Sequence, residues 1–504
     1  MIDPTTLPEM LGRPDAGSDA VVDVDGRILR YEDLTGAVDR LAGQLAGVGV
    51  KRTTPIALLV PNGPPAAVAF LAATQAGIAA PINPALLPAE VDRLLTSLGT
   101  RLVITTTEPP RGLNGLADLR VLTLDPTRLA AGLCSSGRSF AMGEYAQVRP
   151  EDTALILHTS GTTALPKKVA LSHKNLTSSA HNIARWFDLS AADRCLNVMP
   201  LFHIHGLVGM LLATIAGGGS IVCTPGFDAF AFSRWLHDNR PSWFSAVPAI
   251  HQLILARGAD GQRQDLPLRF VRSSSAPLPP RVMRDVEDHY GVPMLEAFGM
   301  TEASHQMAAS PLPPAPRKAG SVGVPTGVEL AVLAHGIPTT EPGVTGEVLV
   351  KGETVHGGYV DAPPEADQEA FVDGWFRTGD LGSFDADGYL FLAGRVKEII
   401  NRGGENISPR EVDEALLEHT AVAQAVAFAM PHKWLGETVA AVVVLGEGSA
   451  VSERELRRFV GDRLAAFKIP ERIIFVADIP RGPTGKVQRI ALAETLGLSG
   501  GSFE

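Results

Sequence analysis

Cysteine is scarce in this sequence of 504 residues, which contains only Cys134, Cys195 and Cys223. The three lie far apart and form no CxxC pair, so the sequence predicts neither a disulfide framework nor a zinc site. Buried or incidental thiols in a reducing compartment are the simplest interpretation. We therefore expect a cytoplasmic protein.

A basic surplus and long apolar runs are also missing. The formal net charge is −11 at pH 7, whereas a general nucleic-acid binder carries excess positive charge, so we expect no nucleic-acid partner. The longest apolar run, at 66–87, contains Thr, Gln, Asn and Pro, which favours a buried helix followed by a strand over a membrane span. The first ten residues lack a basic segment followed by an apolar one, so no secretory signal is expected.

The chain is too long for one ordinary domain, and its composition and apolar pattern change along its length. Short apolar runs such as TALILHTS and RFVRSSSA alternate with segments of helical periodicity, which predicts an α/β fold with largely parallel sheets. After about residue 320 the sequence is rich in glycine, short strands and turn pairs, as in a β-rich subdomain. A compact α+β unit follows, with a boundary near 394–398.

One stretch, HTSGTTALPKK, places hydroxyls, a glycine and lysines directly after an apolar strand. Such a loop offers backbone N–H groups and hydroxyls that, with a nearby lysine, wrap phosphate oxygens. It is not a Walker loop, because G-x-x-x-x-G-K-[ST] is absent. The alternative is a polar surface turn. The candidate phosphate ligands are Thr159, Ser160, Gly161, Thr162, Thr163 and Lys167.

Two acidic motifs follow. In MLEAFGMTEASHQM, Glu302 is suited to Mg²⁺ on a triphosphate and Thr301 to a phosphate oxygen; the alternative is a helix N-terminus with Thr301 as its cap. In WFRTGDLG, Asp380 is suited to accept two hydrogen bonds from a ribose diol, although the same residues are also compatible with a simple turn.

Two motifs lie near the C-terminus. In AGRVKEIINRGGENISP, Arg395 is a permanent cation, and Gly403 and Gly404 permit a close-packed loop; the alternative is a linker with solvated charges. In IPRGPTGKVQR, Lys486 lies in a loop rich in proline and glycine. This lysine matters only if its loop reaches an active site.

These five stretches, in this order, resemble the adenylate-forming superfamily of acyl-CoA synthetases, adenylation domains and luciferases. The resemblance extends from RYEDLTGAVDRLAGQL near the start to GKVQR near the end. It implies an α/β fold, with two α/β subdomains and a β-barrel at 1–394, a hinge at 395–398 and a small mobile α+β domain at 399–504. It also implies that a carboxylic acid is esterified to AMP and that CoA then displaces the AMP. The implied cofactors are ATP, Mg²⁺ and CoA, and the protein is expected to be a monomer or homodimer.

The resemblance assigns a role to each motif residue. Thr301 would contact the α-phosphate, Glu302 would hold Mg²⁺ and Lys486 would bridge the acid and the α-phosphate during adenylation. Lys397 would lie at the hinge, where rotation exchanges Lys486 for the 402–405 loop. The remaining positions are His203 at the pantetheine tunnel, Asp380 and Arg395 at the ribose, Gly403 and Gly404 in the exchanged loop, and Ser274, Ser275, Ala276 and Pro277 along the adenine and acyl sites. For His205 the interpretation of a packed or surface histidine stays open.

The family's phosphate loop usually reads TSGTTGxPKG, and this chain departs from it. Ala164 and Lys168 stand where the last two glycines are expected. Because alanine avoids positive φ, the loop is expected to be stiffer or differently shaped. The Lys168 charge would either assist the nucleotide or be solvated.

The runs MTEASHQM, RKAGSVGVPTG, INRGGENISPREVDEALL and LAAFKIPERIIF are similar to the oxalyl-CoA synthetase branch. That branch implies that His305 and either Ser274 or Ser275 meet a small dianionic acid, since a second carboxylate requires hydrogen bonds or positive charge. A fatty acid would instead require an apolar channel, which Met300, Met307 and Leu207 are equally able to line. A helix-face role without a ligand is the alternative for His305.

Other functions share parts of this pattern. A luciferase-like oxygenase would share the adenylation step, and a peptide-synthetase adenylation domain would act with a separate carrier protein. A non-catalytic nucleotide-binding or scaffold protein is a different class again. The substitution Lys486→Ala distinguishes an enzyme from a non-catalytic protein, because an enzyme should lose adenylation and keep ATP binding.

Overall fold

A computed structural model describes residues 3–106, 118–125, 133–135, 138–159, 167–257, 266–480 and 487–498. The chain divides into two compact units. The first contains residues 1–329 and 350–376, and the second contains residues 330–349 and 377–504. Among the described residues, no helix is long and apolar enough to cross a membrane.

The first unit is built around two nine-stranded sheets. One runs in the order β17-β16-β15-β14-β13-β11-β12-β1-β2. Its strands from β1 through β12, β11, β13 and β14 to β15 are parallel, and β16 is antiparallel to β15. The bounds are β1 Asp19–Asp23, β2 Ile28–Arg30, β11 Arg194–Asn197, β12 Ser220–Cys223, β13 Trp243–Ala246, β14 Phe270–Ser274, β15 Met294–Met300, β16 His305–Ala309 and β17 Val324–Pro325.

The second sheet runs in the order β21-β10-β9-β4-β3-β5-β6-β7-β8. Its centre is parallel, and β9 and β10 form an antiparallel pair. The bounds are β3 Pro55–Leu59, β4 Ile78–Pro81, β5 Leu102–Thr106, β6 Arg120–Leu124, β7 Leu133–Ser135, β8 Arg138–Ser139, β9 Thr153–Thr159, β10 Lys167–Ser172 and β21 Tyr359–Val360.

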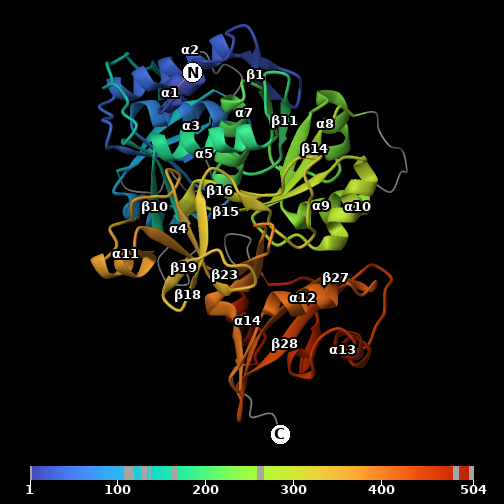
Figure 1. Ribbon diagram of the computed structural model, residues 1–504. Coiled ribbons are helices and arrows are strands. Elements are labelled where there is room, and N and C mark those ends of the chain that lie inside the picture. The colour runs from blue at the N-terminus through green and yellow to red at the C-terminus, as the bar shows by residue number, and fades with distance from the viewer. Residues whose placement is uncertain are drawn as a thin grey trace. The chain divides into compact units, whose positions relative to one another are not determined.

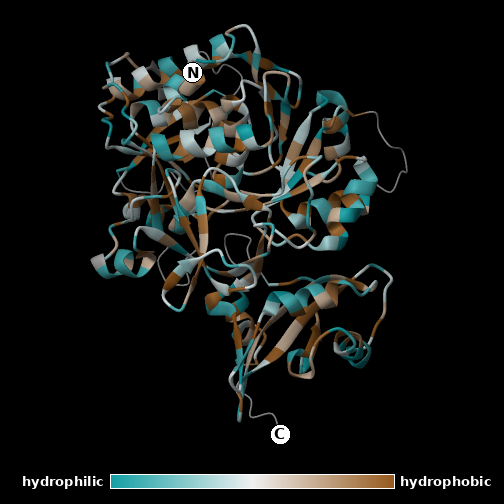
Figure 2. Ribbon diagram, in the orientation of Figure 1, coloured by the Kyte–Doolittle hydropathy of each residue, from teal (hydrophilic) through white to brown (hydrophobic). Residues whose placement is uncertain are grey.

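Helices complete the α/β layers of this unit. The core combines both sheets with α2 (Tyr31–Gly47), α3 (Pro64–Ala76), α5 (His173–Trp186) and the π-helix Leu207–Leu212. Figure 1 shows α8 (Phe232–Asn239), α9 (Pro248–Arg257) and α10 (Pro280–Tyr290) beside strand β14. Figure 2 shows apolar colour along the strands and polar colour on α10, as expected of a helix with one solvated face.

The second unit begins at Leu330, and the later boundaries between the units fall inside β20 (Thr345–Lys351) and β23 (Trp375–Phe384). These strands belong to a sheet in the order β19-β18-β20-β23-β22, with β24 on β23. A five-stranded sheet follows, in the order β26-β25-β28-β27, with β29 parallel to β28. The bounds are β18 Glu329–Ala334, β19 Ile337–Thr339, β22 Phe371–Val372, β24 Leu390–Arg395, β25 Ile400–Arg402, β26 Glu405–Ile407, β27 Val422–His432, β28 Gly436–Leu445, β29 Arg472–Phe475, α12 Pro409–Leu417 and α13 Glu453–Gly461.

The predicted fold class is confirmed, and most predicted elements are present. The apolar run at 66–87 begins with helix α3, and strand β4 follows, as expected. The stretch SERELRRFVGDRLAAFK has the apolar periodicity of one amphipathic helix, but helix α13 ends at Gly461, before Lys468. A Cβ at Gly461 would lie 3.0 Å from Ile469, and glycine is a weak helix former. The division of the chain into two compact units does not identify a hinge, so the hinge at 395–398 stays a prediction.

Candidate active site

The predicted phosphate loop joins two antiparallel strands of the second sheet. Thr159 ends β9, Lys167 begins β10, and the two are paired across the ladder. Ser160, Gly161, Thr162 and Thr163 lie outside the described residues, as does Ala164. The strand pair therefore determines where the loop starts and ends.

Lys167 and Glu302 both contact one tyrosine, Tyr359. The Lys167 ammonium lies 4.2 Å from the ring centroid of Tyr359, a cation–π contact. The Tyr359 hydroxyl donates to Glu302 Oε1 at 3.3 Å, and Glu302 is buried. The structure thus brings together a lysine and a carboxylate that are 135 positions apart in the sequence.

The neighbouring lysine has different partners. The Lys168 ammonium donates to Ser97 O at 2.7 Å and forms an ion pair with Asp361. The Lys168 side chain is only 11% exposed. Its charge is therefore engaged within the protein, which answers the question that this departure from the family loop raised.

Thr301 and Glu302 do not begin an α-helix. They follow β15 in a single turn of 3₁₀-helix, Thr301–Ala303, whose N-cap is Met300 and which has no side-chain cap. The alternative of a capping role for Thr301 is thus not what the structure shows. The turn leaves Glu302 buried and Thr301 half-buried.

A polar network lies at the carboxyl end of β14. We call Ser245, Arg272, Ser275, His205, His305 and Gln306 the histidine network. His205 Nε2 lies 2.7 Å from Ser245 Oγ and its Nδ1 lies 3.1 Å from Ser275 Oγ. The His205 and His305 rings are stacked, with centroids 5.0 Å apart. Arg272 Nη2 lies 2.9 Å from both His305 Nε2 and Gln306 Oε1.

Burial controls the ionisation of this network. It lowers the pKa of His305 well below its ordinary value, and the Arg272 charge lowers it further. The pKa of His205 is lowered for the same first reason, with His305 and Arg272 adding to it. Burial also lowers the pKa of Arg272 to about 9. At neutral pH the network is thus one guanidinium cation among neutral imidazoles.

Three residues of this region have a left-handed backbone. Ser275 has φ of 70°, Ser304 of 53° and His305 of 95°. Residues other than glycine seldom adopt these values, and such strain concentrates at functional sites. The Ser304 hydroxyl donates to Thr354 O at 2.8 Å, and its carbonyl accepts from Ser179. These bonds stabilise the turn that directs His305 toward Arg272.

The network reaches the surface at its edge. Ser275 is half-buried, and Ala276 and Pro277 are exposed. His203 is half-buried, and its Nδ1 accepts from the His205 N–H at 3.3 Å. Ser274 is fully buried and its hydroxyl donates to Ala297 O at 2.9 Å. Of the two candidate serines, Ser275 is the one whose side chain belongs to the network.

The predicted ribose residues lie together in the second unit. Asp380 and Arg395 are partners across β23 and β24, and Arg395 Nε lies 3.0 Å from Asp380 Oδ1. Asp380 lies within a strand and not in the simple turn considered from the sequence, although Gly379 before it has φ of 75°. An acidic side chain that is 11% exposed beside an arginine suits a sugar diol.

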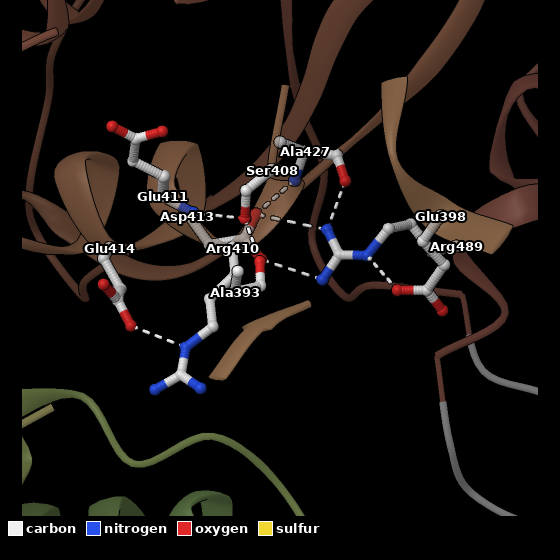
Figure 3. A network of polar contacts seen from close by, with 9 residues as sticks. All are labelled: Ala393, Glu398, Ser408, Arg410, Glu411, Asp413, Glu414, Ala427 and Arg489. Atoms are coloured by element: carbon white, nitrogen blue, oxygen red, sulfur yellow. Dashed lines mark hydrogen bonds and ion pairs between the residues drawn. The ribbon is translucent and has the colours of Figure 1, made fainter. Parts of the chain in front are cut away.

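The remaining candidate site residues also belong to the second unit. Lys397 is exposed on the 3₁₀-helix Val396–Glu398. Gly403 and Gly404 have φ of 62° and 98° in the turn between β25 and β26, so this turn requires glycine. Lys486 lies outside the described residues. Figure 3 shows Arg489, three positions later, enclosed by Glu398, Asp413 and the Ala427 carbonyl.

Comparison with known proteins identifies the family. The family model described as AMP-binding enzyme matches residues 12–360. A second, described as AMP-binding enzyme C-terminal domain, matches residues 411–486. The chain is an AMP-binding enzyme.

Relatives of this AMP-binding enzyme include the oxalate–CoA ligase of Arabidopsis thaliana, which is 40% identical over 92% of this chain and 93% of that protein. The sulfoacetate–CoA ligase of Cupriavidus necator is 37% identical over 93% and 92%, respectively. The ATP-bound crystal structure of MatB from Rhodopseudomonas palustris superposes with a TM-score of 0.88 at 29% identity, over 98% of this chain and 99% of that one. The resemblance found in the sequence is thereby confirmed.

The AMP-binding enzyme is an AMP-forming acid–thiol ligase, that is, an acyl-CoA synthetase that uses ATP and CoA. The roles of its individual residues stay predictions. Sequence reasoning missed two residues that the structure makes prominent, Arg272 and Tyr359. A signal existed for Arg272, since a charge inside the apolar strand RFVRSS must find buried partners. Nothing in the sequence predicted that Tyr359 would contact Glu302.

Two of the three cysteines agree with the expectation of buried thiols. Cys195 and Cys223 are both free and buried. Burial raises the pKa of Cys223 to about 12 and that of Cys195 as well. Among the described residues no group of three or more His, Cys, Asp or Glu side chains is arranged to hold a metal ion.

Proposed function

We propose that this ligase activates a small carboxylic acid that carries a second anionic group, with oxalate as the favoured substrate. The observation that supports this choice is the position of His305 between the His205 ring and the Arg272 guanidinium. A second carboxylate removed from water requires hydrogen-bond donors or positive charge. A fatty acid would require an apolar channel instead.

The relatives support the same substrate class. One is named for oxalate and another for sulfoacetate. Both acids are small, and both place a second anionic group beside or one carbon away from the reacting carboxylate. The shared requirement is neutralisation of that second charge. Ser275 and His305 are the proposed substrate residues, because both belong to the histidine network, and Ser274 would support the strand end through its backbone hydrogen bond.

The proposed nucleotide ligands are the motif residues predicted from the sequence. Thr159, Lys167 and the loop between them are proposed to wrap the β- and γ-phosphates, and Thr301 to contact the α-phosphate. Asp380 and Arg395 are proposed to hold the ribose. Cations placed before reaction lower the barrier created when an anionic acid approaches an anionic phosphate.

Glu302 is the proposed Mg²⁺ ligand. A single buried carboxylate suits Mg²⁺, which binds through one or two carboxylates plus substrate phosphates and keeps several waters. When bound, the ion supplies charge neutralisation on the phosphates. The Tyr359 hydroxyl would orient the Glu302 carboxylate, and the face of its ring would hold Lys167.

Lys486 is proposed to contact the acid and the α-phosphate during adenylation. Rotation at Lys397 would then withdraw it and bring in the Gly403–Gly404 turn, with His203 at the entrance for the CoA thiol. The decisive variant is Lys486→Ala, tested by oxalate-dependent exchange of pyrophosphate into ATP. We expect a loss of at least about 100-fold, because one preorganised contact to the developing charge contributes that much.

Two controls accompany this experiment. ATP binding by Lys486→Ala, measured by calorimetry, should stay within about threefold of wild type because the other phosphate contacts remain. Lys433→Ala, which changes an exposed lysine of the same unit, should retain full exchange. A protein with no acid-dependent exchange in either form, but with ATP binding, would contradict the proposal and favour a non-catalytic nucleotide-binding protein.

A further inference from the structure

Arg272 is a buried cation whose described partners are all neutral. It is completely buried on β14. Its Nη2 donates to His305 Nε2 and Gln306 Oε1 at 2.9 Å, and its Nη1 lies 3.4 Å from Ser245 Oγ. The Phe187 ring lies 5.6 Å from the guanidinium carbon. These neutral groups solvate the guanidinium charge but do not neutralise it.

A counter-ion is missing among the residues that the structure describes. No carboxylate pairs with Arg272 there, and its buried Nε has no hydrogen-bond partner. By contrast, Arg269 near the start of the same strand pairs with Asp193 at 2.7 Å. A charge buried without an opposite charge is costly. An anion that binds nearby would remove that cost, which a second neutral ligand group would not do.

Arg272 also determines which nitrogen of His305 carries the proton. A guanidinium has only donors, so the contact requires Nε2 of His305 to be the acceptor. A neutral ring with an unprotonated Nε2 carries its proton on Nδ1. No described residue accepts a hydrogen bond from that Nδ1. His305 therefore has one fixed acceptor site occupied by Arg272 and one donor available for a ligand.

A glycine of the π-helix makes this contact sterically feasible. A Cβ added to Gly209 would lie 2.4 Å from His305 Nε2 and 3.2 Å from Arg272 Nη1. Any side chain at this position would push the imidazole and the guanidinium apart. π-helical turns are rare and are frequently found at functional sites.

From these contacts we infer that Arg272 is a positioning and specificity-determining residue, which holds His305 as a neutral Nδ1–H donor and supplies the positive charge that selects acids with a second anionic group. The inference rests on the proposed function and deepens it. Arg272 acts through His305 and through its field, since it is itself buried beneath the half-exposed edge of the network.

The first test compares wild type with Arg272→Gln for oxalate and for acetate, a small acid without the second charge. We expect kcat/KM for oxalate to fall about 10- to 100-fold, the effect of losing a charge-assisted hydrogen bond. The change should appear in KM for oxalate, while KM for ATP and kcat/KM for acetate stay within about threefold. Arg272→Lys should restore part of the selectivity because it keeps the charge.

Two variants separate this role from simple destabilisation. Arg269→Gln removes a partly buried arginine of the same segment, and Ser273→Ala removes a buried hydroxyl that has no partner. Neither should change the ratio of oxalate to acetate activity. If wild type prefers oxalate and Arg272→Gln reduces both acids equally, the inference is wrong and the proposed function stands. If wild type prefers acetate, both are wrong.

A second measurement requires only folded wild-type protein. In protein labelled with ¹⁵N-histidine, the His305 signals are assigned by their absence from His305→Gln. We expect a neutral ring protonated at Nδ1 throughout pH 6–8, because burial and Arg272 hold its pKa well below the ordinary value. A ring protonated at Nε2, or one that becomes cationic in this range, would overturn the inference even if Arg272→Gln does not fold.

Discussion

Two adjacent lysines show how far a residue's role depends on its partners. Lys167 and Lys168 follow each other in β10, so their side chains leave opposite faces of the strand. Lys167 lies over Tyr359, which contacts Glu302. Lys168 pairs with Asp361 and donates to Ser97 O. Composition alone gives both residues the same chemistry, and only the fold separates them.

This difference predicts opposite effects of two alanine substitutions. Lys167→Ala should raise KM for ATP about tenfold and leave stability nearly unchanged, because it removes a phosphate contact from an exposed lysine. Lys168→Ala should leave KM for ATP unchanged and lower the free energy of unfolding by about 1–2 kcal/mol, because it removes a largely buried charged hydrogen bond. Steady-state kinetics and urea unfolding measure the two effects. Equal effects of both variants on KM would contradict the assignment.

At the scale of elements, much was predictable from the sequence. Strands β9 and β14 are short apolar runs that end in polar or small residues, and helix α5 follows its capping serine. The side-chain contacts of the site were not predictable, because they join distant elements. Arg272 on β14 reaches β16, and Tyr359 on β21 meets the turn after β15. Local periodicity contains no information about such pairings.

Arg489 provides an element-scale prediction in the second unit. It joins the 3₁₀-helix Val396–Glu398, helix α12 and strand β27 through Glu398, Asp413 and the Ala427 carbonyl (Figure 3). Arg489→Ala leaves the Asp413 carboxylate buried without its partner and should lower the free energy of unfolding of this unit by about 3–5 kcal/mol.

The control is Arg463→Ala, which removes an ion pair with Glu418 that is 63% exposed. That change should lower the free energy of unfolding by less than about 1 kcal/mol. Urea unfolding of the full chain, followed by hydrogen exchange of β27 and α12 amides, separates the second unit from the first. If Arg489→Ala and Arg463→Ala lower the free energy of unfolding equally, the contacts of Arg489 do not stabilise these elements.

At the scale of the whole molecule, the first unit contains several histidines kept neutral by burial. Burial lowers the pKa of His173 to about 3, with the Arg52 charge adding to it, and those of His158 and His251 to about 4. A histidine with a lowered pKa binds fewer protons when folded than when unfolded. Its stabilising contribution is therefore complete above about pH 6.5 and is lost as the pH falls below that value.

We therefore expect the first unit to become less stable between pH 7.5 and pH 5.5. Each such histidine should contribute a loss of about 1.4 kcal/mol at one pH unit below 6.5. Urea unfolding at several pH values measures how steeply the free energy of unfolding depends on pH. His173→Gln should reduce this pH dependence by the contribution of one histidine. His237→Gln changes a side chain that is 74% exposed and should leave the pH dependence unchanged. A stability that rises on acidification would contradict this account.

The central claim, that the ligase selects a small acid with a second anionic group, is tested most directly by one measurement. CoA-dependent AMP formation from ATP and Mg²⁺ is measured with oxalate, malonate, acetate, octanoate and an aromatic acid. We predict a kcat/KM for oxalate at least about tenfold above those for acetate and octanoate, since one charge-assisted contact to the second carboxylate accounts for that ratio. Turnover confined to octanoate or to the aromatic acid would contradict the claim, while leaving the chain an acyl-CoA synthetase.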